Sequence, residues 1–132
     1  MAATDGKSVR AVLWDFQQPQ QPVSNRSFYS RVQPAADSAP IALQVLHAKA
    51  GKYRLHLHRT GFRANDPYTA YVEMGMPAQL TSEQLGRLSD LTRDTPESSR
   101  IVSIGKSGAF TLKVPMRSND VVLVTLEPLR GR

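Results

Sequence analysis

A strict alternation of apolar and polar residues between Lys52 and Arg59 constrains the fold of this chain more than any other feature. Tyr53, Leu55 and Leu57 occupy every second position, and basic or histidine residues lie between them. Because successive side chains of a β-strand point to opposite faces, this period of two predicts a strand with one apolar and one polar face. We therefore expect a fold based on β-sheets.

Further strands are predicted where short apolar runs lie between proline, glycine and other turn residues. These runs are Val9–Phe16, Ile41–Ala48, Arg100–Ile104, Ala109–Val114 and Val121–Leu126. A tight turn at 49–52 leads from the second run into the alternating strand, so we expect these two strands to form a β-hairpin. The stretch from Gln17 to Pro40 contains four prolines and is expected to be an irregular connection, with at most a short strand at Ser27–Val32.

The strand predicted at Val9–Phe16 carries apolar side chains on both of its faces. This pattern is typical of a strand that is covered on two sides. We therefore expect Trp14 to lie in the core and not on a sugar-binding platform. The other aromatic residues considered for such a platform are Phe28, Tyr29, Phe62, Tyr68 and Tyr71.

Two helix signals interrupt the β pattern at about residues 62–92. Asp66 followed by Pro67 is a typical N-cap with proline in the first turn, and it predicts a short helix over Tyr68–Met74. Thr81 and Gln84 form a capping box that begins a second helix. The apolar stripe of this second helix consists of Leu85, Leu88 and Leu91. The predicted fold is mainly β, an antiparallel β-sandwich with a short two-helix insertion.

The length of 132 residues fits one domain, which we expect to span residues 9–132, with residues 1–8 as a linker or an added start. A (β/α)₈ barrel needs about 200 residues or more, so the chain is too short for one. No apolar run reaches the roughly 20 residues that cross a bilayer, and we expect no membrane partner. The start lacks the apolar core of a signal peptide, and the location is left open between the cytoplasm and the periplasm or exterior of a bacterium.

The chain carries a net charge of +6 and has a pI near 10.1, which raises the question of nucleic-acid binding. The basic residues are scattered along the sequence and form no recognisable nucleic-acid motif, so we expect no nucleic-acid partner. The chain contains no cysteine, and this excludes disulfides and cysteine-ligated metals.

The three histidines are the candidates for a metal site. His56 and His58 lie two residues apart on one strand and share a face, and His47 is expected on the neighbouring strand of the hairpin. Lys52 and Arg54 lie on the same face and would repel a metal ion. The histidines are better explained as the polar face of the strand, and we expect neither a metal nor another cofactor.

No catalytic arrangement is predicted. Glycoside hydrolysis usually needs two carboxylates about 5 to 10 Å apart. No pair stands out among the four glutamates, which are Glu73, Glu83, Glu97 and Glu127. The Gly-x-Ser-x-Gly nucleophile elbow and the phosphate-binding loops are also absent from the sequence.

A longer string in the middle of the chain carries a resemblance. It consists of Gly51–Arg59, Asn65–Tyr71, Glu73–Pro77 and Leu80–Leu85. In this order and spacing it resembles family-39 glycoside hydrolases, the β-xylosidases related to α-L-iduronidase. There a sandwich strand leads to an Asn-containing turn, a short helix with an aromatic residue, a Gly-x-Pro break and a Thr-x-x-Gln helix. Val12–Phe16 resembles the first sandwich strand of that family, and Val114-Pro115 and Val121–Leu126 resemble its last two strands. The likeness therefore runs from about Val9 to Pro128.

The resemblance implies a parent enzyme that is a retaining glycosidase, with two catalytic glutamates in a (β/α)₈ barrel. This chain would be the accessory sandwich that packs on that barrel in the same polypeptide, and no catalytic residue can be assigned to it. We expect the contact with the barrel to include Tyr68, Tyr71, Val72 and Met76. The alternative function is an independent carbohydrate- or protein-binding module. Whether the parent enzyme is an oligomer is left open.

Overall fold

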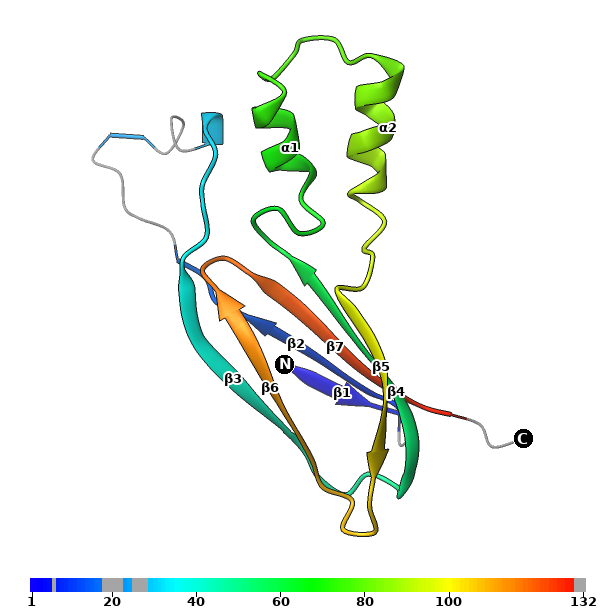
Figure 1. Cartoon of the computed structure of the whole chain (residues 1–132). Coiled ribbons are helices and arrows are strands. Elements are labelled where there is room, and N and C mark those ends of the chain that lie inside the picture. The colour runs from blue at the N-terminus through cyan, green and yellow to red at the C-terminus, as the bar shows by residue number, and fades with distance from the viewer. Residues whose placement is uncertain (6, 18–22, 25–28, 130–132) are drawn as a thin grey trace.

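The computed structural model describes residues 1–5, 7–17, 23–24 and 29–129, which fold into two antiparallel sheets (Figure 1). The five-stranded sheet has the spatial order β1 (Ala2–Thr4), β2 (Val9–Trp14), β7 (Val121–Pro128), β4 (Gly51–Thr60) and β5 (Ser98–Ile104). The two-stranded sheet consists of β3 (Asp37–Val45) and β6 (Phe110–Arg117). These layers confirm the predicted mainly β, antiparallel sandwich.

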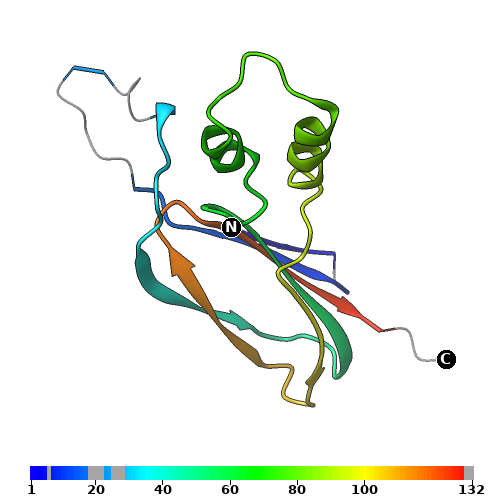
Figure 2. The same ribbon diagram turned by 45° about the horizontal axis from the view of Figure 1, so that its top comes forward.

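The core lies between the two sheets, which Figure 2 shows as separate layers. Tyr53, Leu55 and Leu57 of β4 are buried, as the alternation predicts. They are joined by alternate residues of the other strands, namely Leu112, Val114, Met116, Val122, Val124 and Leu126. The apolar face of each amphipathic strand therefore points to the opposite sheet.

The predicted β-hairpin between the second run and the alternating strand is wrong. β3 pairs with β6, whereas β4 pairs with β5 and β7 in the other sheet. The chain does turn between β3 and β4, but the turn connects the two sheets across the core and does not join neighbouring strands of one sheet. Gly108 is needed beside this crossing, because it has a φ of 68° and an added Cβ would lie 2.7 Å from the Ala48 carbonyl oxygen.

β2 is covered on one side only, so the predicted two-sided burial is also wrong. Ala11 faces the core and is 1% exposed, and Val9 and Leu13 pack beside it. Trp14 points away from the core and is 54% exposed, so its expected core position is wrong. Among the residues that the structure describes, none packs over the second apolar face of β2 closely enough to bury Trp14.

Both helix signals are confirmed. α1 (Pro67–Glu73) begins after Asp66, whose carboxylate accepts a hydrogen bond from the Thr69 amide. α2 (Ser82–Asp90) begins with the complete capping box of Thr81 and Gln84. The two helices contact each other and stand beyond one end of the sandwich (Figure 1).

The apolar stripe of α2 is not buried against the sandwich. No residue of this helix is buried, and Leu85 is 58% exposed.

The remaining predicted segments differ from the structure in two places. Tyr29 and Ser30 form a short 3₁₀ turn within the range predicted as a short strand, and Ser27 and Phe28 lie outside the described residues. β1 lies within the stretch expected to be a linker and pairs with β2. Within the described residues, neither helix is long and apolar enough to span a bilayer.

Candidate functional site

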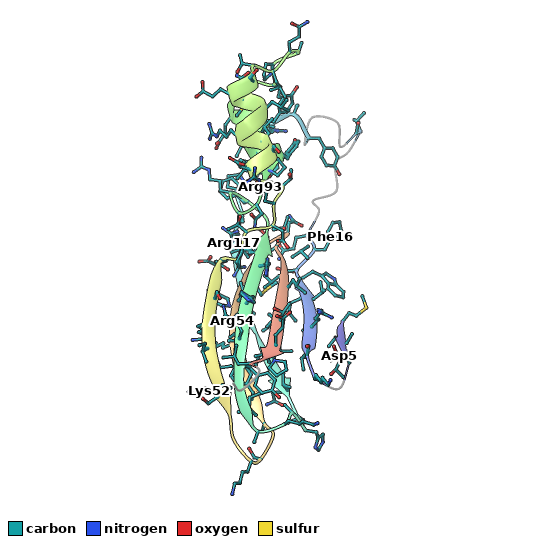
Figure 3. The ribbon with its side chains drawn as sticks, turned by 90° about the vertical axis from the view of Figure 1, so that its right-hand side faces the viewer. Asp5, Phe16, Lys52, Arg54, Arg93 and Arg117 are labelled. Atoms are coloured by element: carbon teal, nitrogen blue, oxygen red, sulfur yellow. The ribbon has the colours of Figure 1, made fainter. Side chains whose placement is uncertain are left out.

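An open groove of about 840 Å³ lies at the end of the sandwich that carries the helices. It is formed by the end of β2, the turn between β6 and β7, the start of α1 and the segment before β3. Its walls carry five large and substantially exposed side chains, which are Trp14, Phe16, Tyr29, Tyr68 and Val121. Figure 3, in which the five-stranded sheet faces the viewer, shows Phe16 just beyond the end of β2 on the side of the helices.

Backbone hydrogen bonds hold the aromatic residues of β2 at the rim of the groove. The Asn119 amide donates to the Asp15 carbonyl at 2.7 Å, and the Gln17 amide donates to Oδ1 of Asn119 at 2.8 Å. The segment that carries Trp14 and Phe16 is therefore fastened to the turn between β6 and β7. On the opposite wall, the Tyr68 hydroxyl donates to the Tyr29 carbonyl.

A buried ion cluster lies beneath this groove. Arg59 donates from Nη1 to Oδ2 of Asp120 at 2.5 Å and from Nε to Glu97 at 3.0 Å. Its Nη2 donates to the Pro115 carbonyl at 3.0 Å. Arg117 donates from its amide, Nε and Nη2 to the same carboxylate, and this hydrogen bonding with Asp120 raises the pKa of Arg117. The Asp120 carboxylate is completely buried.

This cluster is structural, because the guanidinium of Arg59 and the carboxylate of Asp120 form their hydrogen bonds with each other and with neighbouring segments of the chain. The cluster joins the end of β4, the turn between β6 and β7, and the segment that follows α2. The cluster was not predicted from the sequence, although a signal was present. Arg59 continues the parity of Tyr53, Leu55 and Leu57, so it had to share their buried face and needed a carboxylate partner.

The helical insertion is attached to the sandwich by a narrow neck. Asn65 donates from Nδ2 to the carbonyls of Arg59 and Thr95, each at 2.9 Å, and its Oδ1 accepts from the Thr95 amide at 3.1 Å. One asparagine thus joins the two chain segments that lead into and out of the helices. On the entering segment, Arg63 forms an ion pair of 2.6 Å with Glu73 of α1.

The three histidines do not come together as considered from the sequence. His56 and His58 share the outer face of β4, with their ring centroids 6.0 Å apart. His47 lies in the crossing between the sheets and not on a strand paired with β4. His58 Nδ1 lies 2.8 Å from the Asp94 carbonyl. In the part of the chain that the structure describes, no three histidine or acidic side chains are grouped as a metal site would require.

The glutamates also occupy separate structural positions. Glu73 pairs with Arg63, and Glu97 pairs with Arg59. Glu83 lies in the first turn of α2, where a negative charge suits the helix dipole. Glu127 lies opposite Arg54 on neighbouring strands, so each glutamate has a basic residue or a helix end beside it.

The residues expected in an interdomain contact are incompletely covered. Tyr68 and Met76 are each 41% exposed, and Tyr71 and Val72 are half-buried. The Tyr71 hydroxyl donates to the Pro77 carbonyl at 3.1 Å, which ties the end of α1 to the loop that follows. These four residues and the walls of the groove together expose much apolar surface at the helical end of the molecule.

Comparison with solved structures identifies the relatives of this chain. It aligns with the GH39 enzyme from Xanthomonas axonopodis pv. citri at 52% identity and a TM-score of 0.91, covering 97% of this chain and 25% of that one. This chain is related to family-39 glycoside hydrolases. A monomeric β-xylosidase from Caulobacter crescentus CB15 aligns at 45% identity and a TM-score of 0.89, covering 98% of this chain and 26% of that one. No family model and no curated protein matches the chain.

The family-39 likeness extends to more distant structures. A second GH39 β-xylosidase from Caulobacter crescentus is 34% identical, with a TM-score of 0.67, over 96% of this chain and 22% of that one. The bacterial orthologue of human α-L-iduronidase shares the fold at 15% identity and a TM-score of 0.67. The chain therefore spans about a quarter of the length of its family-39 relatives, as the resemblance in the sequence predicts for a small domain of such an enzyme.

Proposed function

We propose that this chain is a non-catalytic accessory domain of a family-39 glycoside hydrolase, and that it packs on and stabilises the (β/α)₈ catalytic barrel of the same polypeptide. The observation that carries the proposal is the alignment of nearly all of this chain with only a quarter of each related enzyme. The parent enzyme is then a retaining, β-xylosidase-like glycosidase. Three quarters of such a polypeptide are available to hold the catalytic barrel.

The geometry of the chain agrees with a role outside catalysis. Glycosidases of the usual kind place two free carboxylates on either side of the scissile bond. The buried carboxylate of Asp120 is held by two arginines, and the side chains of Glu73 and Glu97 form ion pairs. These groups hold the sandwich and its insertion together and are not available as an acid and nucleophile.

The helical insertion forms part of the contact with the barrel in this proposal. Tyr68, Tyr71, Val72 and Met76 lie on or just after α1, which stands beyond the end of the sandwich and leaves Tyr68 and Met76 exposed. An interdomain contact of this kind usually buries about 600–1,500 Å². Hydrogen exchange tests the contact: amides of residues 67–76 should exchange more slowly in the parent polypeptide than in this chain alone, and equal rates would contradict it.

An activity assay tests the accessory role itself. The isolated chain should not hydrolyse aryl β-xylosides or aryl α-iduronides, whereas the parent polypeptide should hydrolyse one of these classes. Variants of the four glutamates, each changed to glutamine, serve as controls for trace contamination. Turnover by the isolated chain that disappears in one of these variants would overturn the accessory role.

An independent carbohydrate-binding module is the second candidate function, and the exposed aromatic residues of the groove favour it. Trp14, Phe16 and Tyr68 could stack on sugar rings if their faces stay open in the whole protein. Titration of the isolated chain with xylo-oligosaccharides decides between the candidates. Saturable binding that is lost in Trp14→Ala would favour the module over the accessory role.

A further inference from the structure

We infer that the catalytic part of the parent polypeptide docks on the outer face of β2 and β7, at a surface centred on Trp14. We call this the Trp14 surface, and it consists of Val12, Trp14, Phe16, Val121 and Leu123. The inference rests on the proposed accessory function and adds a second contact to that of the helical insertion.

Strand register brings these residues together on one face. Trp14 pairs with Val121 and Val12 pairs with Leu123 across β2 and β7, so each pair lies side by side. The core-facing residues of the same strands alternate with them, which places all four on the side of the sheet away from β3 and β6. Phe16 extends the surface beyond the end of β2 and is 75% exposed.

On β2 and β7, the outer face of the sheet is apolar only at the end that adjoins the groove. The neighbouring pairs farther along the same face are polar, with Arg10 opposite Thr125 and Arg54 opposite Glu127. Figure 3 shows Arg54 and Lys52 on this face, at a distance from the helical end. The solvent-facing side of a sheet is usually polar, so the apolar end of this face is suited to contact with another protein surface.

The missing cover explains why the sequence pattern and the structure disagree at β2. The pattern predicts burial on both sides, and the structure supplies burial on the core side only. The unmatched apolar face is satisfied if a protein surface outside this chain packs on it. The related enzymes contain about three times as much chain again, and this additional polypeptide is the occupant that we assign to the surface.

The chemistry of the surface favours a protein over a sugar as this occupant. Sugar sites combine aromatic faces with free hydrogen-bonding groups. Polar groups beside the surface are engaged elsewhere, since Asp15 accepts from Gln17 Nε2 at 2.9 Å and also from Ser38, and Asn119 accepts from the Gln17 amide. His58, which lies opposite Leu123, has its Nδ1 2.8 Å from the Asp94 carbonyl. Aliphatic Val12, Val121 and Leu123 offer packing area but no stacking face.

Residue-resolved hydroxyl-radical footprinting tests this inference. In the isolated chain, Trp14 and Phe16 should be modified rapidly, and in the parent polypeptide their modification should slow by about five-fold or more. In a Trp14→Asp parent, Phe16 should regain the rate that it has in the isolated chain. Equal rates for Trp14 in the chain and in the parent would overturn the docking surface, without any need for a variant.

Ile101→Asp is the matched control. Ile101 lies on the same sheet face, on the distant edge strand β5, and is 58% exposed. This variant should leave the protection of Phe16 in the parent unchanged, and release equal to that in Trp14→Asp would overturn the assignment to this end of the face. Failure of the proposed function would look different, because the isolated chain would then hydrolyse glycosides by itself.

Discussion

Arg59 and Asp120 form the most completely buried ion pair in the part of the chain that the structure describes. Their carboxylate and guanidinium groups lie 2.5 Å apart, and Arg117 adds a second cation on the other side. A buried charge that loses its partner retains its desolvation cost, so removing one member costs more than the pair contributes. This asymmetry makes Asp120 the residue on which the buried ion cluster depends.

Asp120→Ala should lower the free energy of unfolding by about 3–5 kcal/mol, because it leaves Arg59 buried without its main partner. Chemical denaturation of the isolated chain measures this change. Asp90→Ala is the control, since Asp90 pairs with Arg93 on the surface and its loss should change stability by less than about 0.5 kcal/mol. Similar small effects from both substitutions would show that the buried cluster is not stabilised as described.

Gly61→Ala should destabilise the chain by about 1–3 kcal/mol, as overpacking of a filled site usually does. An added Cβ would lie 2.1 Å from Oδ1 of Asp120, and that oxygen is held by Arg117. Gly105→Ala is a matched control, because a Cβ there would have no heavy atom within 4 Å. Thermal melts of the two variants compare them directly, and equal melting temperatures would contradict the close contact.

At the residue scale, the burial of Arg59 could have been predicted from the sequence, although it was missed, whereas the exposure of Trp14 could not. Arg59 alternates in step with Tyr53, Leu55 and Leu57 along β4, and this position places it on the buried face. A buried arginine needs a carboxylate partner, which Asp120 provides. The exposure of Trp14 was not predictable, because an apolar pattern reports that a face is covered and not which polypeptide covers it.

Among the elements, the two helices differ from the strands in how they are specified. The caps of α1 and α2 depend on residues three apart in the sequence, and both were predicted from the sequence. The partner of β3 depends on residues about 70 positions away, and the short turn before β4 predicted the wrong neighbour. Local sequence signals therefore predicted where the elements lie, whereas the pairing of the strands depends on how the whole core packs.

Thr81→Ala should raise the exchange rates of the amides in α2 by about five-fold, which corresponds to roughly 1 kcal/mol for the loss of a helix cap. The global melting temperature should change little, because α2 buries none of its residues and can open by itself. Ser89→Ala, in the exposed second half of the helix, is the control. A large fall in melting temperature for Thr81→Ala would show that α2 is coupled to the sandwich.

For the molecule as a whole, the sandwich is complete at its core but open at its helical end. The ion cluster and the neck at Asn65 fix the insertion to the same end at which the Trp14 surface and the groove lie. Apolar surface that is rigidly held at one end of a small domain is an arrangement suited to docking. The resemblance to family-39 enzymes is the basis for the partner that we propose, and the Trp14 surface is the face at which we infer that it docks.

The fluorescence of the isolated chain offers a direct test of this arrangement, because Trp14 is its only tryptophan. With 54% of its surface exposed, Trp14 should emit at long wavelength and be quenched efficiently by acrylamide in the native state. Its quenching constant should lie within about two-fold of that of the chain unfolded in denaturant, since a native tryptophan is shielded mainly by burial. Val122→Trp in a Trp14→Phe background places the reporter in the core and serves as the contrast if that variant folds. A blue-shifted emission from Trp14 with weak quenching, unchanged on dilution, would show that this chain buries the residue itself and needs no partner to cover it.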